Sequence, residues 1–298
     1  MSLAVAPLTL NRLLEDSGID LRHVVVFRHR PWEPELNRVF DWIVSERRDL
    51  FECYQDSHTP RAEGALLRAN YVASFIRYRP KQALFVGLYT IASHRELTVP
   101  EYLQRPAHIE LMSHGMGGLM ASDGREHVIE FNLVPTGWQE NWSERLIVEW
   151  PGLERSWYRW ADRNVFPVSA ITEESCLIGQ VPPWDEITLE WRELALLPQN
   201  WKTALTHWRG IYLIIDQSDG MQYVGSAYGR ENILQRWQEY ARTGHGSNKG
   251  LRARKPQNFR FSILQRTSPD LPGAEVIALE QSWKLRLRSH APYGLNEN

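Results

Sequence analysis

Hydrophobic positions in the first part of the chain follow the spacing of a helix in some segments and of a strand in others. After Pro34, apolar residues recur every three or four positions, which is typical of a helix with one buried face; they are Leu36, Val39, Phe40, Ile43 and Val44. Runs rich in β-branched and aromatic residues predict strands at 23–28, 71–79, 83–92, 127–133 and 145–150. Helices mixed with antiparallel strands indicate an α+β fold.

The C-terminal part of the chain shows a clearer pattern. Two alternating runs, 210–216 and 221–227, flank the turn sequence Gln217-Ser218-Asp219-Gly220. An Asp-Gly pair between two such runs is typical of a β-hairpin. After the hairpin we expect a helix over 230–243, a strand over 259–264 and a helix over 273–289. This part is therefore predicted to be a compact ββαβα unit.

Prolines mark the expected boundary between the two parts. Pro182-Pro183 and Leu197-Pro198 interrupt regular structure between Gln180 and Asn200. We therefore expect a mixed α+β domain over 1–195, followed by the ββαβα domain over 196–298. The chain has no internal repeat that would indicate a different organisation.

Composition excludes several classes of protein. With 43% hydrophobic and 23% charged residues among 298, the chain is neither disordered nor of low complexity. Apolar runs such as 83–92 are about half as long as a membrane-spanning helix, and the N-terminus lacks the pattern of a signal peptide. Two cysteines, Cys53 and Cys176, provide neither a disulfide framework nor a CxxC metal site. We expect a cytoplasmic protein that does not bind membranes.

The net charge of −2 conceals a split between the two parts of the chain. Residues 206–298 contain 13 Lys and Arg against 8 Asp and Glu, whereas residues 1–205 contain the remaining 21 and 28. No acidic residue occurs between 240 and 269. This basic segment is either a solvated face or a surface for the phosphates of DNA. The residues that we expect to contact nucleic acid are Tyr228, Arg242, Lys249, Arg252, Arg254 and Lys255.

Two short motifs lie on the predicted hairpin, Gly210-Ile211-Tyr212 and Tyr223-Val224-Gly225. Their sequence and separation resemble the two-part signature of the GIY-YIG nuclease family. The family pattern continues with an arginine and a tyrosine one helical turn apart, then a glutamate on a later helix and an asparagine near the end. The matching positions here are Arg236, Tyr240, Glu280 and Asn296. The resemblance covers roughly residues 205–298.

These residue types suit the hydrolysis of a phosphodiester. Glu280 supplies a hard anionic oxygen for Mg²⁺ or Mn²⁺, and Arg236 offers a planar cation that matches phosphate. The resemblance implies that Tyr212 is the general base and that Tyr223 positions the water or the scissile phosphate. His245, in the glycine-bracketed loop 244–250, is a candidate for proton transfer. The predicted catalytic set is Tyr212, Tyr223, Arg236, Tyr240, His245, Glu280 and Asn296.

Each assignment has a structural alternative. Tyr212 and Tyr223 can be cross-strand packing residues, and Arg236 a solvated helix residue. The carboxylate of Glu280 is harder to explain structurally, because it adjoins the apolar stripe formed by Val276, Leu279 and Trp283. A second aromatic group, between 138 and 160, is either core or a pocket for an extruded base; its members are Trp138, Trp142, Trp150, Trp157, Tyr158 and Trp160.

Together these features predict a metal-dependent DNA endonuclease whose N-terminal domain selects the target. We expect a restriction or defence role. The alternatives are a structure-specific DNA repair nuclease and a non-catalytic nucleic-acid-binding protein that keeps the fold. Double-strand cleavage by one active site would need either a homodimer or two successive nicks, and both arrangements are compatible with the sequence.

Overall fold

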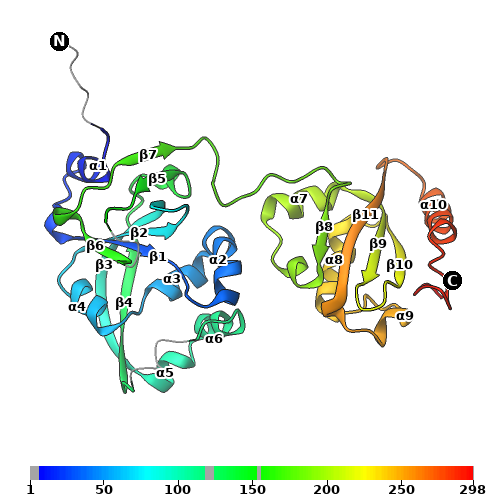
Figure 1. Cartoon of the computed structure of the whole chain (residues 1–298), viewed down its shortest axis with the longest axis horizontal. Helices are drawn as coiled ribbons and strands as arrows, with labels where there is room; N and C mark the ends of the chain where they lie inside the picture. The colour runs from blue at the N-terminus through cyan, green and yellow to red at the C-terminus, as the bar shows by residue number, and fades with distance from the viewer. Residues whose placement is uncertain (1–6, 118–123, 153–155, 298) are drawn as a thin grey trace, which may run out of the picture. The chain divides into compact units, whose positions relative to one another are not determined.

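The computed structural model describes residues 7–117, 124–152 and 156–297, which belong to two compact units (Figure 1). Unit 1 comprises residues 1–178 and unit 2 residues 179–298. Each unit combines helices with a β-sheet, so the predicted α+β class is confirmed. Within the described ranges, none of the helices has both the length and the hydrophobicity that crossing a bilayer requires.

Unit 1 is built on a sheet whose strands run in the order β6-β1-β2-β3-β5-β7, with β4 paired to β3 outside this path. The pair β1–β2 is parallel and the other pairs are antiparallel. The long strand β3 joins the halves of the sheet, because it pairs with β2 and then with β4. The strands are β1 (Val24–His29), β2 (Tyr71–Arg77), β3 (Gln82–Thr98), β4 (His127–Pro135), β5 (Leu146–Glu149), β6 (Tyr158–Trp160) and β7 (Val168–Ile171).

Helices of unit 1 bury apolar stripes on this sheet. The periodicity after Pro34 correctly predicts α2, whose Leu36, Phe40, Ile43 and Val44 are buried. They share one cluster with residues of α3, α6 and the sheet. The helices are α1 (Leu10–Asp16), α2 (Pro34–Glu46), α3 (Arg48–Gln55), α4 (Pro60–Leu66), α5 (Val99–Leu103) and α6 (Pro106–Ser113), with short 3-10 turns at η1 (Leu21–His23), η2 (Glu140–Trp142) and η3 (Ala161–Arg163).

The aromatic side chains between 138 and 160 do not gather into one pocket. Trp150 is buried in a cluster against which Trp138 and Trp142 also pack. Trp157 and Trp160 pack instead against a second cluster, around Phe27 and Phe131. The alternation of side chains along the strands separates the two groups, as Ala73 and Val72 of β2 belong to different clusters. The six rings therefore do not line one common pocket: Trp150 is core, and the other five are partly buried and pack against the two clusters.

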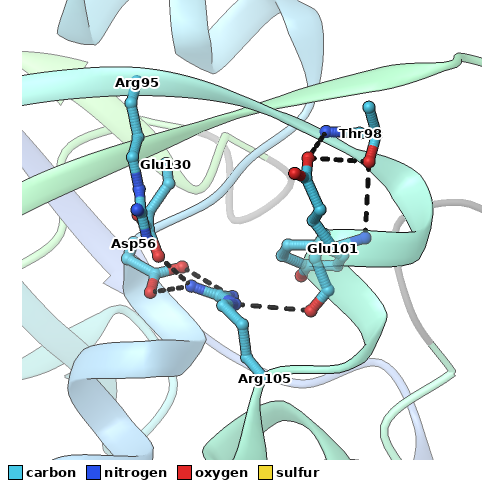
Figure 2. Close-up of polar contacts among 7 residues, drawn as sticks. Asp56, Arg95, Thr98, Glu101, Arg105 and Glu130 are labelled. Carbon is cyan, nitrogen blue, oxygen red and sulfur yellow. Dashed lines mark hydrogen bonds and ion pairs between the residues drawn. The ribbon is translucent and has the colours of Figure 1, made fainter.

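A polar cavity lies elsewhere in unit 1. Arg105 binds Asp56 (Nη1–Oδ2 2.6 Å) and Glu130 (Nη1–Oε1 2.7 Å), and Arg95 also binds Glu130 (Figure 2). Burial raises the pKa of Asp56 to about 6 although Arg105 opposes this shift. These four side chains line a cavity of about 660 Å³, which Glu52 also lines. The cavity is charged, in contrast to the expected aromatic site.

Unit 2 has an antiparallel sheet in the order β10-β9-β11-β8. The predicted hairpin is present as β9 and β10, and helix α8 ends at Gly244, whose φ of 77° favours glycine. Both helices expected after the hairpin are found, as α8 and α10. The elements are β8 (Thr188–Glu190), η4 (Trp191–Ala195), α7 (Gln199–His207), β9 (Arg209–Asp216), β10 (Gln222–Ala227), α8 (Asn232–Thr243), α9 (Lys249–Arg252), η5 (Pro256–Asn258), β11 (Phe259–Thr267) and α10 (Gly273–Arg286).

The compact units divide the chain earlier than the expected boundary at 195/196. Unit 2 begins at Gly179, because β8 pairs with β11 and joins the second sheet. The residues Ile187, Leu189 and Leu194 accordingly belong to the core of unit 2. The prolines at 182 and 183 precede this strand, and the proline at 198 lies within the unit.

His108 is an unusual buried residue of unit 1. It is fully buried in α6, its ring packs on Tyr102 with centroids 4.2 Å apart, and neither ring nitrogen has a hydrogen-bond partner in the described structure. Burial, with the positive charge of Arg105, lowers the pKa of His108 to about 4. Below pH 6.5 the unfolded chain therefore binds a proton at this position that the folded chain does not.

We predict that His108 makes unit 1 less stable as the pH falls from 6.5 towards 4, by about 1.4 kcal/mol per pH unit. His108→Phe keeps the ring contact with Tyr102 and removes the titrating group. Urea unfolding of both proteins across this range checks the prediction, because groups shared by the two proteins cancel in the difference. Parallel pH profiles for the two proteins would contradict it.

Candidate active site

The two motif tyrosines lie on one face of the β9–β10 hairpin. Tyr212 is paired with Gly225 and Tyr223 with Ile214, so the period of two along each strand directs both rings to the same side. Tyr212 is fully buried and Tyr223 is 9% exposed. A Cβ atom at position 225 would overlap the hydroxyl group and ring of Tyr212. Glycine is therefore required at 225 for the Tyr212 ring to cross the neighbouring strand.

A chain of hydrogen bonds links three tyrosine hydroxyls. Tyr223 donates to Asn248 Oδ1 (2.9 Å), and Asn248 Nδ2 donates to the hydroxyl of Tyr240 (2.8 Å). The hydroxyls of Tyr240 and Tyr212 lie 3.0 Å apart. Tyr240 comes from α8, and Asn248 from the loop before α9. The structure thus brings together Tyr212, Tyr223 and Tyr240 as predicted, and adds Asn248, which the sequence analysis missed within its glycine-bracketed loop.

Arg236 lies one turn before Tyr240 on α8 and adds a positive charge to this cluster. The nearby Tyr212 hydroxyl is the main cause that raises the pKa of Arg236. Burial raises the pKa of Tyr212, Tyr223 and Tyr240, and the charge of Arg236 opposes the shift in each case. The three phenols are therefore protonated at neutral pH. Nε of Arg236 is buried and has no partner within the described structure.

Glu280 approaches from a different helix. α8 packs with the tyrosine face of the hairpin, whereas α10 packs on the other face, against Ile211, Leu213 and Val224 (Figure 1). One carboxylate oxygen of Glu280 is 2.7 Å from Lys284 Nζ, and the other accepts a hydrogen bond from Ser226. The charge of Glu280 contributes to raising the pKa of both motif tyrosines.

The sequence analysis missed the two partners of Glu280. Lys284 follows Glu280 by one helical turn, a spacing that the sequence displays, but it is only 6% exposed, which the sequence does not reveal. Ser226 directly follows the second motif. A buried ion pair beside the hairpin explains how the carboxylate is tolerated next to an apolar stripe.

Asn296 is a positioning residue in this structure. Its side chain is 3% exposed; Nδ2 donates to the carbonyl of Val224 (2.8 Å) and Oδ1 accepts from its amide (2.9 Å). The amide of Leu295 also donates to the carbonyl of Gln222 (2.8 Å). The C-terminal segment is thus attached to β10, the strand that carries Tyr223. Both polar atoms of the Asn296 side chain bind backbone here, and a catalytic role for Asn296 stays a prediction.

His245 also has a local contact. Its Nδ1 accepts a hydrogen bond from the backbone amide of Ser247 (3.0 Å), which closes the turn after α8. In the described structure no hydrogen bond joins this ring to the tyrosine cluster. The loop matters to the site through Asn248, and a proton-transfer role for His245 stays a prediction.

The residues expected to contact nucleic acid fall into two groups. Arg254 binds Asp216 (3.0 Å) and Asp219 across the hairpin turn, so its charge stabilises the fold. Arg242 pairs with Glu239 (2.7 Å), and Lys249 is 3.9 Å from Glu297, yet both cations remain largely exposed. The side chains at the surface without such ion pairs in the described structure are Arg252, Lys255 and Tyr228, the last of which contacts the guanidinium of Arg209.

Two comparisons with known proteins concern the part of the chain that contains this site. Residues 209–294 match the family model described as the GIY-YIG catalytic domain. Among solved structures, the catalytic domain of the homing endonuclease I-TevI is similar, with 28% sequence identity over 30% of this chain and 98% of that chain, and a TM-score of 0.25. No curated protein matches the chain. The family match confirms the resemblance seen in the two motifs and supports endonuclease activity for the domain at residues 209–294.

Proposed function

Because residues 209–294 are a GIY-YIG catalytic domain, we propose that the chain is a metal-dependent endonuclease that hydrolyses phosphodiester bonds of DNA. The observation that supports this most directly is the hydrogen-bonded group of Tyr212, Tyr240 and Tyr223 beside Arg236. Hydrolysis needs a proton acceptor for water and positive charge at the phosphate oxygens. The cluster contains candidates for both.

The residues fit a single hydrated metal ion. In the part of the chain that is described, no three His, Cys, Asp or Glu side chains gather as a ligand cage. Mg²⁺ is commonly held by one or two carboxylates and keeps several waters, and Mn²⁺ accepts the same oxygen ligands, so Glu280 alone would suffice. When bound, the ion would stabilise negative charge on the phosphate and acidify a water. Lys284 forms an ion pair with the same carboxylate.

The protein side chains have distinct proposed roles. Arg236 binds a non-bridging phosphate oxygen through its planar guanidinium, since the side chain is only partly buried. Tyr212 accepts a proton from the attacking water at its phenolic oxygen. Tyr223 orients the water or the phosphate. Because burial raises the pKa of Tyr212, the reaction on this assignment becomes faster as the pH rises above neutrality.

We place phosphate contacts on the exposed cations that follow α8. Arg252 and Lys255 lie at the surface near α9, in the segment without acidic residues. Exposed cations of this kind bind the DNA backbone without reading its sequence. Arg254, in contrast, forms ion pairs with Asp216 and Asp219 at the hairpin turn.

We assign target selection to unit 1. Its cavity is lined by the carboxylates of Asp49, Glu52, Asp56 and Glu130 against the guanidiniums of Arg95 and Arg105. Such a lining repels phosphate and favours a group that donates hydrogen bonds, such as the amino and ring N–H groups of a base. A restriction-like role in the cytoplasm agrees with a separate reading unit. A structure-specific repair nuclease would instead cleave DNA at branches or lesions. A non-catalytic nucleic-acid-binding protein that keeps the fold would not cleave DNA.

We predict that Glu280→Gln reduces DNA cleavage at least about 100-fold, because it removes the proposed metal-binding charge. The full chain is incubated with Mg²⁺ and plasmid, linear, branched or base-modified DNA, and product is measured on gels. Glu275→Gln, an exposed position on the same helix, is the matched control and should cut normally. Cleavage that persists in Glu280→Gln would refute the metal assignment, and branch-only cleavage would favour the repair nuclease. A wild-type chain that binds but never cuts would favour the binder.

We predict that Arg252→Ala combined with Lys255→Ala weakens DNA binding and lowers its dependence on salt. The slope of log K against log salt should fall by about 0.9 for each phosphate that the protein no longer neutralises. Binding is measured by fluorescence anisotropy in the inactive Glu280→Gln chain. Arg163→Ala removes an exposed charge in unit 1 and is the control. An unchanged slope in the double variant would place the phosphate contacts elsewhere.

We predict that Glu52→Gln reduces the preference for the favoured DNA about tenfold, while the rate on other DNA is unchanged. Glu52 is half-buried in the cavity lining, and burial raises its pKa. Glu15→Gln, on the exposed side of α1, is the control. The readout is the ratio of kcat/KM between DNA substrates. If that ratio stays at the wild-type value, this cavity does not select the target.

A further inference from the structure

Asn248 joins two hydroxyls of the active site but has no charge and no proton to transfer at neutral pH. We propose that Asn248 is a positioning residue whose amide sets the direction of the hydrogen-bond chain, so that the Tyr212 oxygen receives a hydrogen bond from Tyr240. The proposal rests on the nuclease function proposed above and deepens it, because it explains how a buried tyrosine becomes able to act as a base.

The orientation of the Asn248 amide is determined by a third contact. Besides the Tyr240 hydroxyl, Nδ2 lies 3.2 Å from the carbonyl oxygen of Gly246. A backbone carbonyl can only accept, so the NH₂ group must face Gly246 and Tyr240. The carbonyl oxygen of the amide then faces Tyr223, whose hydroxyl is the donor at 2.9 Å.

This orientation determines where the next hydrogen goes. The Tyr240 oxygen already accepts from Asn248, so the hydroxyl hydrogen of Tyr240 is available for the Tyr212 oxygen at 3.0 Å. The positive charge of Arg236 also lowers the pKa of Tyr212. A phenolic oxygen that accepts a hydrogen bond and has a cation nearby has its anionic form stabilised, which partly offsets the cost of burial.

The opposite orientation would disable the same residues. If the amide oxygen faced Tyr240, that hydroxyl would donate to Asn248 and would accept from Tyr212. The proton of Tyr212 would then be held inside the cluster. With the observed orientation, the hydroxyl hydrogen of Tyr212 is not bound to Tyr240, and the phenolic oxygen, once ionised, can take a proton from the attacking water. The water oxygen then forms the new P–O bond as the bond to the leaving oxygen breaks.

The loop is shaped to present Asn248 to Tyr240. A Cβ atom at Gly246 would overlap the Tyr240 ring, and φ at Gly246 is 53°. Ser247 adopts φ of 66°, a left-handed conformation that is uncommon for a residue with a side chain. The backbone therefore passes directly over the ring before Asn248 turns back to its hydroxyl. This close approach accounts for glycine at position 246, which the catalytic chemistry alone leaves unexplained.

Charged groups around Tyr212 also shift its pKa, and their influence is distinct from that of the Asn248 amide orientation. Arg236 lowers the pKa of Tyr212, whereas Glu280 raises it and is itself paired with Lys284. Tyr223 and Tyr240 complete the titratable groups of the cluster. Asn248 differs from all of them because it acts through the direction of its hydrogen bonds.

The experiment uses Asn248→Asp and Tyr240→Phe, singly and together, in the full chain. The ionised carboxylate introduced by Asn248→Asp accepts from both tyrosines, so Tyr240 no longer donates to Tyr212. We expect kcat to fall about tenfold with KM nearly unchanged, and the rising limb of the pH profile to move to higher pH by about one unit. Tyr240→Phe removes the same donor and should cause a similar shift.

The double variant separates direction from charge. If Asn248 acts through Tyr240, adding Asn248→Asp to Tyr240→Phe produces no further shift of the pH profile. If the new negative charge alone matters, the shift recurs in full in the Tyr240→Phe background, and the proposal is overturned. A wild-type profile in Asn248→Asp overturns it as well.

A second measurement does not depend on cleavage. Ultraviolet absorbance of the folded proteins follows tyrosine ionisation as the pH is raised, and circular dichroism confirms that each variant is folded. We expect Asn248→Asp to raise the pH at which the first buried tyrosine ionises. This rise should disappear in the Tyr240→Phe background. Such a result supports the proposed direction of the hydrogen-bond chain even if no tested DNA is cut. The absence of cleavage would count against the proposed nuclease function alone. Equal titration curves for all four proteins would overturn the proposed direction of the hydrogen-bond chain.

Discussion

The need to satisfy hydroxyl groups inside an apolar core governs the active site. Tyr212 and Tyr240 are fully buried, and a buried hydroxyl without a partner costs free energy comparable to that of a missing hydrogen bond. The two groups satisfy each other, and Asn248 continues the chain to Tyr223. The hairpin, α8 and the loop before α9 are thereby held in one relative arrangement, and this arrangement also places Arg236 beside Tyr212.

Two further elements support the hairpin, one at the edge of β10 and one on the face opposite the tyrosines. Asn296 binds both backbone groups of Val224, as a neighbouring strand would, and keeps β10 from becoming a free edge. α10 covers the apolar face of β9 and β10 and carries the ion pair of Glu280 with Lys284. The catalytic surface is therefore made of a thin hairpin supported on both faces. Gly225 permits this because it leaves room for the Tyr212 ring.

The two units differ in charge, which bears on the separate roles proposed for them. Unit 2 has an excess of positive charge in an exposed segment and a site suited to phosphate. Unit 1 has an excess of negative charge and a cavity lined by more carboxylates than guanidiniums. A negatively charged unit gains little from coating DNA, so the recognition role proposed for unit 1 requires a specific contact. The opposite charges of the two units thus agree with separate cutting and reading roles.

The α+β class, the hairpin and the helix periodicities follow from the sequence alone, as do the identities of Tyr212, Tyr223, Arg236 and Glu280, because periodicity and motif spacing are local properties of the chain. The roles of Asn248, Lys284 and Asn296 emerge only in the folded protein. Each of these roles depends on which backbone, hydroxyl or charged group lies opposite the side chain once the elements have packed. The same reason applies to Arg254: a run of basic residues is visible in the sequence and suggests a phosphate contact, but the two carboxylates that bind this guanidinium meet it only in the folded hairpin.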